Sequence, residues 1–139
     1  MPWQQLKLET NVVLARPTGL WTLIIDYLPG PAAIKIAAND AQWSYSEAPT
    51  TQCGADGDPD SLLARTRCLL TTAPVGALVG KIGGSTAGVV SDGALFVVGR
   101  SCVVQIPEGG APVYLTINDE SGGMANNSGQ IDVSVYQWS

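Results

Sequence analysis

The sequence contains no histidine among its 139 residues, and this absence removes several classes of chemistry. Ser-His-Asp and Cys-His catalysis need an imidazole base, and many zinc sites need its nitrogen as a ligand. Positive charge is also scarce, because seven Lys and Arg stand against twelve Asp and Glu, for a net charge of −5. These cations are scattered along the chain, so we expect no nucleic-acid partner. A hydrolase built from this sequence would have to rely on carboxylates alone.

Long apolar runs are absent too. No stretch approaches the roughly 20 apolar residues of a membrane-spanning helix, so we predict no membrane insertion. The first ten residues, MPWQQLKLET, lack the basic segment and the apolar segment of an ordinary secretion signal. We therefore expect a cytoplasmic protein, or one that is released by a non-classical route.

Cysteine is rare, and none of the three cysteines lies in a CxxC pair, which argues against a zinc or redox motif. Cys53 and Cys68 could form a disulfide if the compartment is oxidising. The interpretation that we favour is that Cys53, Cys68 and Cys102 are reduced and serve as small buried side chains.

The sequence is rich in short β-prone runs that are separated by Gly, Pro, Asn and Asp. About eight such runs in one chain of this length predict an all-β fold, a jelly-roll-like β-sandwich of two antiparallel sheets in a single domain over residues 1–139. Ile131, Val133 and Val135 alternate with polar residues, as in a half-buried strand. The runs are LKLETNVVLA, LWTLIIDYL, AAIKIAA, GALVGKIG, GALFVVG, SCVVQI, VYLTIND and QIDVSVYQW.

The middle of the chain is harder to interpret. The segment PDSLLARTRCLL, residues 59–70, is compatible with a short helix capped by Asp60 or Ser61, or with a single turn that leads into a strand. Just before it, DGDPD places acidic residues at alternate positions, like the start of an EF-hand loop. The required Gly and Glu are replaced by Ser61 and Arg67, so we predict a solvated turn and leave a secondary binding role for its acids open.

The segment INDESGGMANNSG, residues 117–129, is far longer than the two to five residues of a hairpin connection. Asp119 supplies a carboxylate, Asn126 and Asn127 supply amide oxygens, and glycines between them free the backbone. Oxygen donors with little formal charge suit Ca²⁺, and a site with one carboxylate leaves room for hydroxyls of a sugar. On composition alone a polar surface loop is the simpler interpretation, because Asn, Asp and Gly are ordinary turn residues.

A resemblance adds to this interpretation. The runs GALVGKIGG, LFVVG and VYLTINDESGGMANNSG, closed by IDVSV, resemble in this order the soluble calcium-dependent galactophilic bacterial lectins of the LecA (PA-IL) type. The likeness extends upstream through MPWQQLKL, LWTLIIDYLPGPAAIKIAA and WSY, and so covers essentially the whole chain. The spacing from ND to NNSG is its most specific element, and residues 46–74 are its least specific part.

The resemblance implies a calcium site. By matching position, Asp119, Asn126 and Asn127 would be side-chain ligands of Ca²⁺. Tyr45 and Gly123 fall where the family donates backbone carbonyls, which tolerates Gly123 in place of the family's usual Thr.

Sugar selection in that family uses a His and a Gln from the loop before the GALV strand. This chain has no histidine, and its loop reads CGADGDPDSLL, so Asp58, Asp60 or Ser61 would have to replace them. The residues expected to contact the carbohydrate are Asp119, Glu120 at the rim, Gly123, Asn126, Asp58, Asp60 and Ser61.

We therefore expect a calcium-dependent lectin without enzymatic activity, with galactosides as the leading ligand and extracellular glycans as its targets. The resemblance implies a homo-oligomer, a homotetramer in the family, which would raise avidity. The alternatives are a carbohydrate-binding module of a larger glycosidase or adhesin, and a relative with altered or lost sugar binding. A glycosidase with paired carboxylates such as Asp58 and Asp119 is disfavoured, because a chain this small offers little scaffold for a deep cleft.

Overall fold

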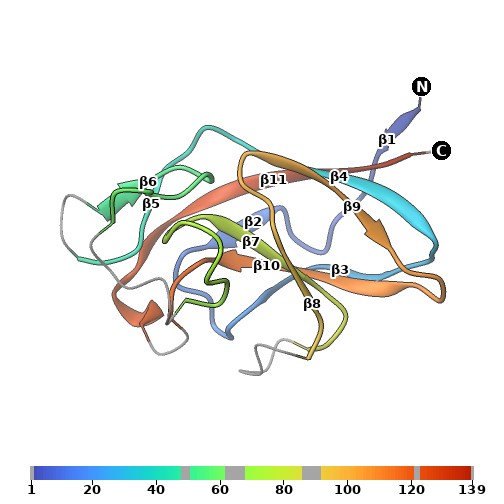
Figure 1. Cartoon of the computed structure of the whole chain (residues 1–139). Helices are drawn as coiled ribbons and strands as arrows, with labels where there is room; N and C mark the ends of the chain where they lie inside the picture. The colour runs from blue at the N-terminus through green and yellow to red at the C-terminus, as the bar shows by residue number, and fades with distance from the viewer. Residues whose placement is uncertain (1, 48–50, 62–67, 86–91, 121–122, 139) are drawn as a thin grey trace.

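Two antiparallel sheets make up the computed structural model, which describes residues 2–47, 51–61, 68–85, 92–120 and 123–138 (Figure 1). The all-β sandwich predicted from the sequence is confirmed. The larger sheet contains β1 (Trp3–Gln5), β2 (Val12–Leu14), β4 (Ala32–Ala38), β5 (Trp43–Ser44), β6 (Gln52–Cys53), β9 (Ser101–Ile106) and β11 (Ser128–Trp138). The smaller sheet has the order β3 (Thr22–Leu28), β10 (Ala111–Ile117), β7 (Leu78–Ile82) and β8 (Ala94–Val97).

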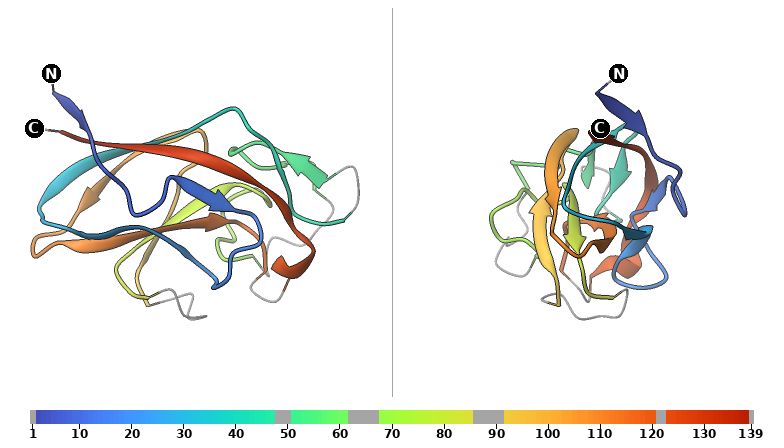
Figure 2. Two further views of the ribbon diagram at one scale, coloured as in Figure 1. Left: turned by 180° about the vertical axis from the view of Figure 1, so that it is seen from behind. Right: turned by 90° about the vertical axis from the view of Figure 1, so that its right-hand side faces the viewer.

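The longest strand, β11, organises the larger sheet. It pairs with β4 and β1 along its second half and with β5 and β2 along its first, and it runs along the length of the molecule in Figures 1 and 2. Ile131, Val133 and Val135 are buried between less buried neighbours, as their alternation predicted. Gly129 has a φ of +91°, and a Cβ there would lie 2.9 Å from the Cα of Trp43. The start of β11 therefore requires glycine for both conformation and space.

The segment between β10 and β11, residues 118–127, connects the two sheets, and we call it the crossing segment. Strand β10 belongs to the smaller sheet and β11 to the larger one, and the 3₁₀ helix η3 (Met124–Asn126) lies just before β11. A crossing between layers needs more residues than a hairpin turn. The crossing between the sheets therefore explains why this segment is longer than a hairpin turn. Its oxygen-rich composition is a separate feature, which suggests a binding role.

The expected strands differ from the observed ones in two places. LKLETNVVLA does not form one strand: β1 ends before it and β2 lies within it. The short strands β5 and β6 had no recognisable signal, because two residues carry no periodicity. Most of the expected helix, residues 62–67, lies outside the described residues. No helix in the described part of the chain is long and apolar enough to cross a membrane.

The three cysteines, all within the described residues, are thiols rather than disulfide partners. Cys68 forms an isolated β-bridge with Glu120, and Cys53 is buried in β6. Burial raises the pKa of both the Cys53 and the Cys102 thiol to about 11, so these two cysteines are protonated at neutral pH.

A buried lysine lies in the smaller sheet. Lys81 has no exposed surface, and its ammonium group has several interaction partners inside the protein. It forms an ion pair of 2.7 Å with Asp92, donates to the Ser85 carbonyl, and lies 5.1 Å from the ring centre of Trp21 and 5.0 Å from that of Tyr114. A buried cation is tolerated when charge and hydrogen bonds compensate its desolvation.

Asp92→Asn keeps the size of the side chain but leaves the Lys81 ammonium without an anionic partner. We expect a lower free energy of unfolding at neutral pH, measured by urea denaturation. The hydrogen bond from Lys81 is the main cause that lowers the pKa of Asp92 below its ordinary value of 3.8. The stabilisation is therefore complete above this value and disappears as the pH falls through the folded-state pKa, where variant and wild type should converge. Asp26→Asn, at an exposed position of β3, is the control, and equal neutral-pH stability of Asp92→Asn would contradict the argument.

Candidate functional site

Asn118, directly after β10, clamps the crossing between the sheets. It is fully buried, and its Oδ1 accepts a hydrogen bond of 2.9 Å from the Leu70 N–H. Its Nδ2 donates to the carbonyls of Leu70, Ala73 and Pro74 at 3.0–3.2 Å, and its backbone N–H donates to Ala77 at 2.7 Å. The residue that follows is thereby held in one place. No structural role for Asn118 was predicted from the sequence, because an Asn that follows an apolar strand is equally common in an exposed turn.

Next to this clamp, two buried oxygens have no hydrogen-bond partner in the part of the chain that the structure describes. The Oδ1 of Asp119 accepts a 2.8 Å hydrogen bond from the Glu120 N–H, but its Oδ2 has no partner among the described residues. Asn127 donates from Nδ2 to the Ala15 carbonyl at 2.9 Å, and its Oδ1 also has no partner there. The two residues are only 4% and 2% exposed. Buried polar atoms are nearly always hydrogen-bonded, so a pair of unpartnered oxygens in one segment indicates a binding role.

The electrostatics of Asp119 agree with this geometry. Burial raises the pKa of the Asp119 carboxyl above its ordinary value, while the Glu120 N–H and the nearby Asn127 side chain act in the opposite direction. The contribution from Asn127 means that the two side chains lie close to each other. A positive charge between them would stabilise the ionised carboxylate.

Gly123 lies beside the same carboxylate. Its N–H donates to the Glu120 carbonyl at 2.9 Å, and a Cβ at this position would lie 2.8 Å from the Glu120 Cγ and 3.5 Å from the Asp119 Oδ1. Its φ of −102° is available to any residue. The lack of space for a Cβ, and not the backbone conformation, therefore favours glycine at this position. Asn126 follows in η3 with an exposed side chain.

Tyr45 reaches this region through the strand register. Ser44 of β5 pairs with Ser128 of β11 at the end of this antiparallel ladder, and Tyr45 and Asn127 are the residues that adjoin this last pair. The Tyr45 side chain is buried, and its hydroxyl donates to the Asp58 Oδ2 at 2.6 Å. Burial is the first cause, and this hydrogen bond the second, that raise the pKa of Tyr45. The backbone of Tyr45 therefore adjoins the loop from a distant part of the sequence.

The second predicted loop is tied to Tyr45. Asp58 accepts from the Tyr45 hydroxyl and, through Oδ1, from the Asp60 N–H at 3.0 Å. Ser61 is also a hydrogen-bonding neighbour of Tyr45, whereas the Asp60 side chain is exposed. Both Asp58 oxygens are thus engaged within the protein. Asp60 is the more exposed residue, and Ser61 is half-buried like Asp58.

The predicted metal ligands therefore come from two regions that the fold brings together, the crossing segment and the end of β5. Within the described ranges, no three His, Cys, Asp or Glu side chains gather in a group that could hold a metal ion. A cation at this place would depend on one carboxylate and on neutral oxygens. That donor set fits Ca²⁺, which accepts amide and backbone oxygens in a flexible geometry.

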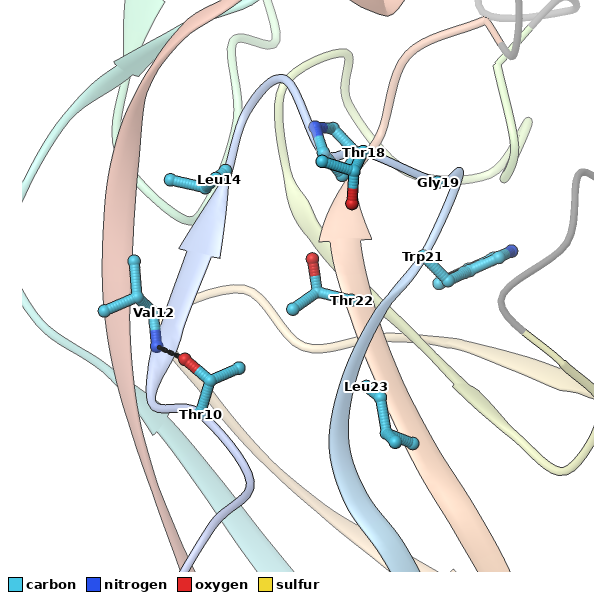
Figure 3. A pocket seen from close by; sticks show the side chains of 9 residues that line it. Thr10, Val12, Leu14, Thr18, Gly19, Trp21, Thr22 and Leu23 are labelled. Atoms are coloured by element: carbon cyan, nitrogen blue, oxygen red, sulfur yellow. Dashed lines mark hydrogen bonds between the residues drawn. The ribbon is translucent and has the colours of Figure 1, made fainter.

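Two hollows elsewhere on the surface are not lined by any buried oxygen that lacks a partner among the described residues. A hollow of about 380 Å³ between β2 and β3 is lined by Thr10, Val12, Leu14 and neighbours (Figure 3). Trp21, whose Nε1 is buried without a partner in the described part of the chain, points away from the other side chains there and packs on Lys81. Another hollow, of about 480 Å³, includes the exposed ion pair of Arg100 with Asp40. The crossing segment is the better candidate site.

Comparison with known proteins gives one informative result. Neither a family model nor a curated protein matches this chain. Among solved structures, the chain is similar to one described as "EclA N-terminal domain; PllA-like lectin", with a TM-score of 0.65 and 18% identity. The match covers 94% of this chain and 97% of that one. At this identity the likeness shows the fold: nearly the whole chain adopts a β-sandwich that is also found in a lectin domain.

Asn118→Ala removes the clamp and leaves several buried backbone groups unpaired. We expect a loss of about 3 kcal/mol in the free energy of unfolding, since each unsatisfied buried group costs about 1–3 kcal/mol. Urea denaturation measures this loss. Asn126→Ala, exposed and eight residues further along, should change stability by less than about 0.5 kcal/mol. Equal stability of the two variants would contradict a clamping role for Asn118.

Asp119→Asn tests the unpartnered carboxylate. Without divalent cations this variant should melt at a higher temperature than the wild type at neutral pH, because it replaces a buried charge by a neutral amide beside the Asn127 side chain. As the pH falls through the raised pKa, the wild type takes up a proton and the two melting temperatures should approach each other. A purely structural role for the carboxylate predicts the opposite, a lower melting temperature for Asp119→Asn. Calorimetry in a chelating buffer distinguishes the two.

Proposed function

We propose that this protein is a calcium-dependent lectin, which binds a carbohydrate through a cation held by the crossing segment. The observation that carries the proposal is a pair of buried oxygens in one segment, Asp119 Oδ2 and Asn127 Oδ1, that have no partner among residues 2–47, 51–61, 68–85, 92–120 and 123–138. The similar solved structure described as a lectin supports the carbohydrate part of the proposal, since it shares this fold over nearly the whole chain.

The residues that would hold the cation are those predicted from the sequence: Asp119, Asn126 and Asn127 by side chains, and Tyr45 and Gly123 by backbone carbonyls. Bound Ca²⁺ would supply a positive charge and open coordination positions for vicinal hydroxyls of a sugar. Asp119 and Asn126 would fix these hydroxyls by hydrogen bonds. The clamp at Asn118 holds the carboxylate in place, so little ordering is required on binding.

Galactosides are the leading ligand because of the sequence resemblance. Asp60 is the exposed acidic residue of the second loop that could contribute to sugar selection, with Ser61 beside it, and Glu120 and Gly123 would form the rim on the other side. Asp58 is engaged by Tyr45 and Asp60, which supports a positioning role over direct sugar contact and over general acid or base catalysis. We propose binding without turnover, by a homo-oligomer such as a tetramer that acts on extracellular glycans.

A second arrangement has one observation in its favour. The similar structure is described as an N-terminal domain, so a sandwich of this kind occurs as one part of a longer protein. A carbohydrate-binding module of an adhesin or glycosidase would use the same site residues. Binding assays on the isolated chain would give the same result for either arrangement.

Ca²⁺ should raise the melting temperature, and a chelator should reverse this. At a concentration of 100 times Kd the stabilisation is about 2.7 kcal/mol, or roughly 10 °C for a chain of this size. The effect should shrink at acid pH as Asp119 takes up a proton, and Asp119→Asn should abolish it. On a glycan array, galactosides should be retained with Ca²⁺ and lost with a chelator.

Asn126→Ala is the matched variant, because its exposed side chain can be removed without disturbing the fold. It should lose glycan retention while keeping the wild-type circular dichroism spectrum. An unchanged melting curve at millimolar Ca²⁺ would overturn the metal site. Glycan binding that persists in both Asn126→Ala and Asp119→Asn would place the sugar elsewhere.

A further inference from the structure

A polar hollow of about 400 Å³ adjoins the proposed calcium site. One side is formed by η3 and the start of β11, including Asn126 and Asn127, and the opposite wall is formed by Ser44, Ser46, Glu47 and Gln52 of β5, β6 and the described residues next to them. Both sides lie at the end of the sandwich opposite the turn between β9 and β10 (Figure 1). Its volume falls in the range of about 300–1,000 Å³ that is usual for small-molecule sites.

Hydrogen bonds among Ser44, Ser46 and Thr51 hold this wall together. The Ser44 hydroxyl donates to the Ser46 carbonyl at 2.9 Å and lies 2.9 Å from the Thr51 hydroxyl. The Ser46 hydroxyl donates to Thr51 at 3.0 Å. These bonds hold the wall in position before any ligand arrives, which lowers the entropic cost of binding.

The longer side chains on this wall have unused hydrogen-bonding capacity. Glu47 and Gln52 line the hollow with exposed side chains that form no hydrogen bond to another described residue. Arg16, on a third side, donates one long hydrogen bond of 3.4 Å to the Ala125 carbonyl. Asn127 also lines the hollow, where it marks the boundary with the proposed calcium site.

The charges around the hollow favour a neutral ligand. Arg16 and Glu47 balance each other, and the remaining polar groups are amides and hydroxyls. An anion would be repelled by Glu47 and a cation by Arg16, whereas a sugar hydroxyl can accept from one and donate to the other. The lining thus suits a neutral polyhydroxylated ring.

We propose that this hollow is a second saccharide subsite, which binds a neutral hexose linked to the sugar at the calcium. The inference rests on the proposed function, because Asn126 and Asn127 belong to both places. The proposed subsite makes Glu47, Gln52 and Arg16 partly responsible for sugar specificity. The sequence analysis attributed this specificity to the loop around Asp58. That loop is tied to Tyr45, whereas these three side chains are available to a ligand.

The test compares galactose with the disaccharides melibiose and lactose by calorimetric titration at saturating Ca²⁺. The wild type should bind one of the disaccharides about three- to tenfold more tightly than galactose, the gain from one or two added hydrogen bonds. In the double variant Glu47→Ala/Gln52→Ala, the ratio of the two affinities should fall to about one. The control Glu108→Ala/Gln105→Ala, at exposed positions near the β9–β10 turn, should keep the wild-type ratio.

Each result separates the subsite from the calcium site. Galactose binding with no gain for either disaccharide, or a gain that survives in the double variant, would overturn the subsite and leave the calcium-dependent lectin intact. A Ca²⁺-induced rise in melting temperature with no binding of any of the three sugars would contradict both the galactoside-binding function and the second saccharide subsite. A missing Ca²⁺ effect would contradict the metal site itself.

Discussion

The hydrogen bonds of Asn118 are the constraint on which the candidate site depends. At this residue the chain leaves the smaller sheet for the larger one, and the side chain holds the backbone of residues 70–74 against the crossing. Leu69 is held in the same way, since its N–H donates to the Asp119 carbonyl at 3.1 Å. With its main chain bonded on this side, Asp119 cannot easily swing its carboxylate toward solvent. The crossing therefore maintains a buried charge that an unconstrained loop would expose.

The two buried charged side chains in the described part of the chain, Lys81 and Asp119, differ in how fully their charges are compensated. The Lys81 ammonium is compensated by Asp92, the Ser85 carbonyl and two aromatic rings. The Asp119 carboxylate has one backbone donor and an oxygen without a partner among the described residues. The fold is thus able to satisfy a buried charge, and it leaves this one incomplete. Local violations of this kind are expected where a protein binds something, because the ligand completes the set of interactions.

The site also depends on contacts between segments far apart in the sequence. The pairing of Ser44 with Ser128 brings Tyr45 beside Asn127, and the hydrogen bond from Tyr45 to Asp58 draws the acidic loop to the same end of the sandwich. On the other flank, Ser44, Ser46, Glu47 and Gln52 form a polar wall. The acidic loop and the polar wall differ in chemistry and lie on either side of the proposed Ca²⁺ site. Substitutions in these two flanks could change the sugar preference without changing the proposed metal ligands.

The sequence by itself determined the all-β class, the face of β11 that is buried, and the oxygen-rich segment, because alternation and residue chemistry are local properties. It could not show that this segment crosses between sheets, that Asn118 is a clamp while Asp119 and Asn127 keep unpartnered oxygens, or that Asp58 is already engaged by Tyr45. Nor could it reveal the two-residue strands that bring Tyr45, Glu47 and Gln52 to the site. These features were decided by tertiary structure alone, since burial and hydrogen-bond partners arise from residues brought together across the sandwich, and local sequence contains no record of them.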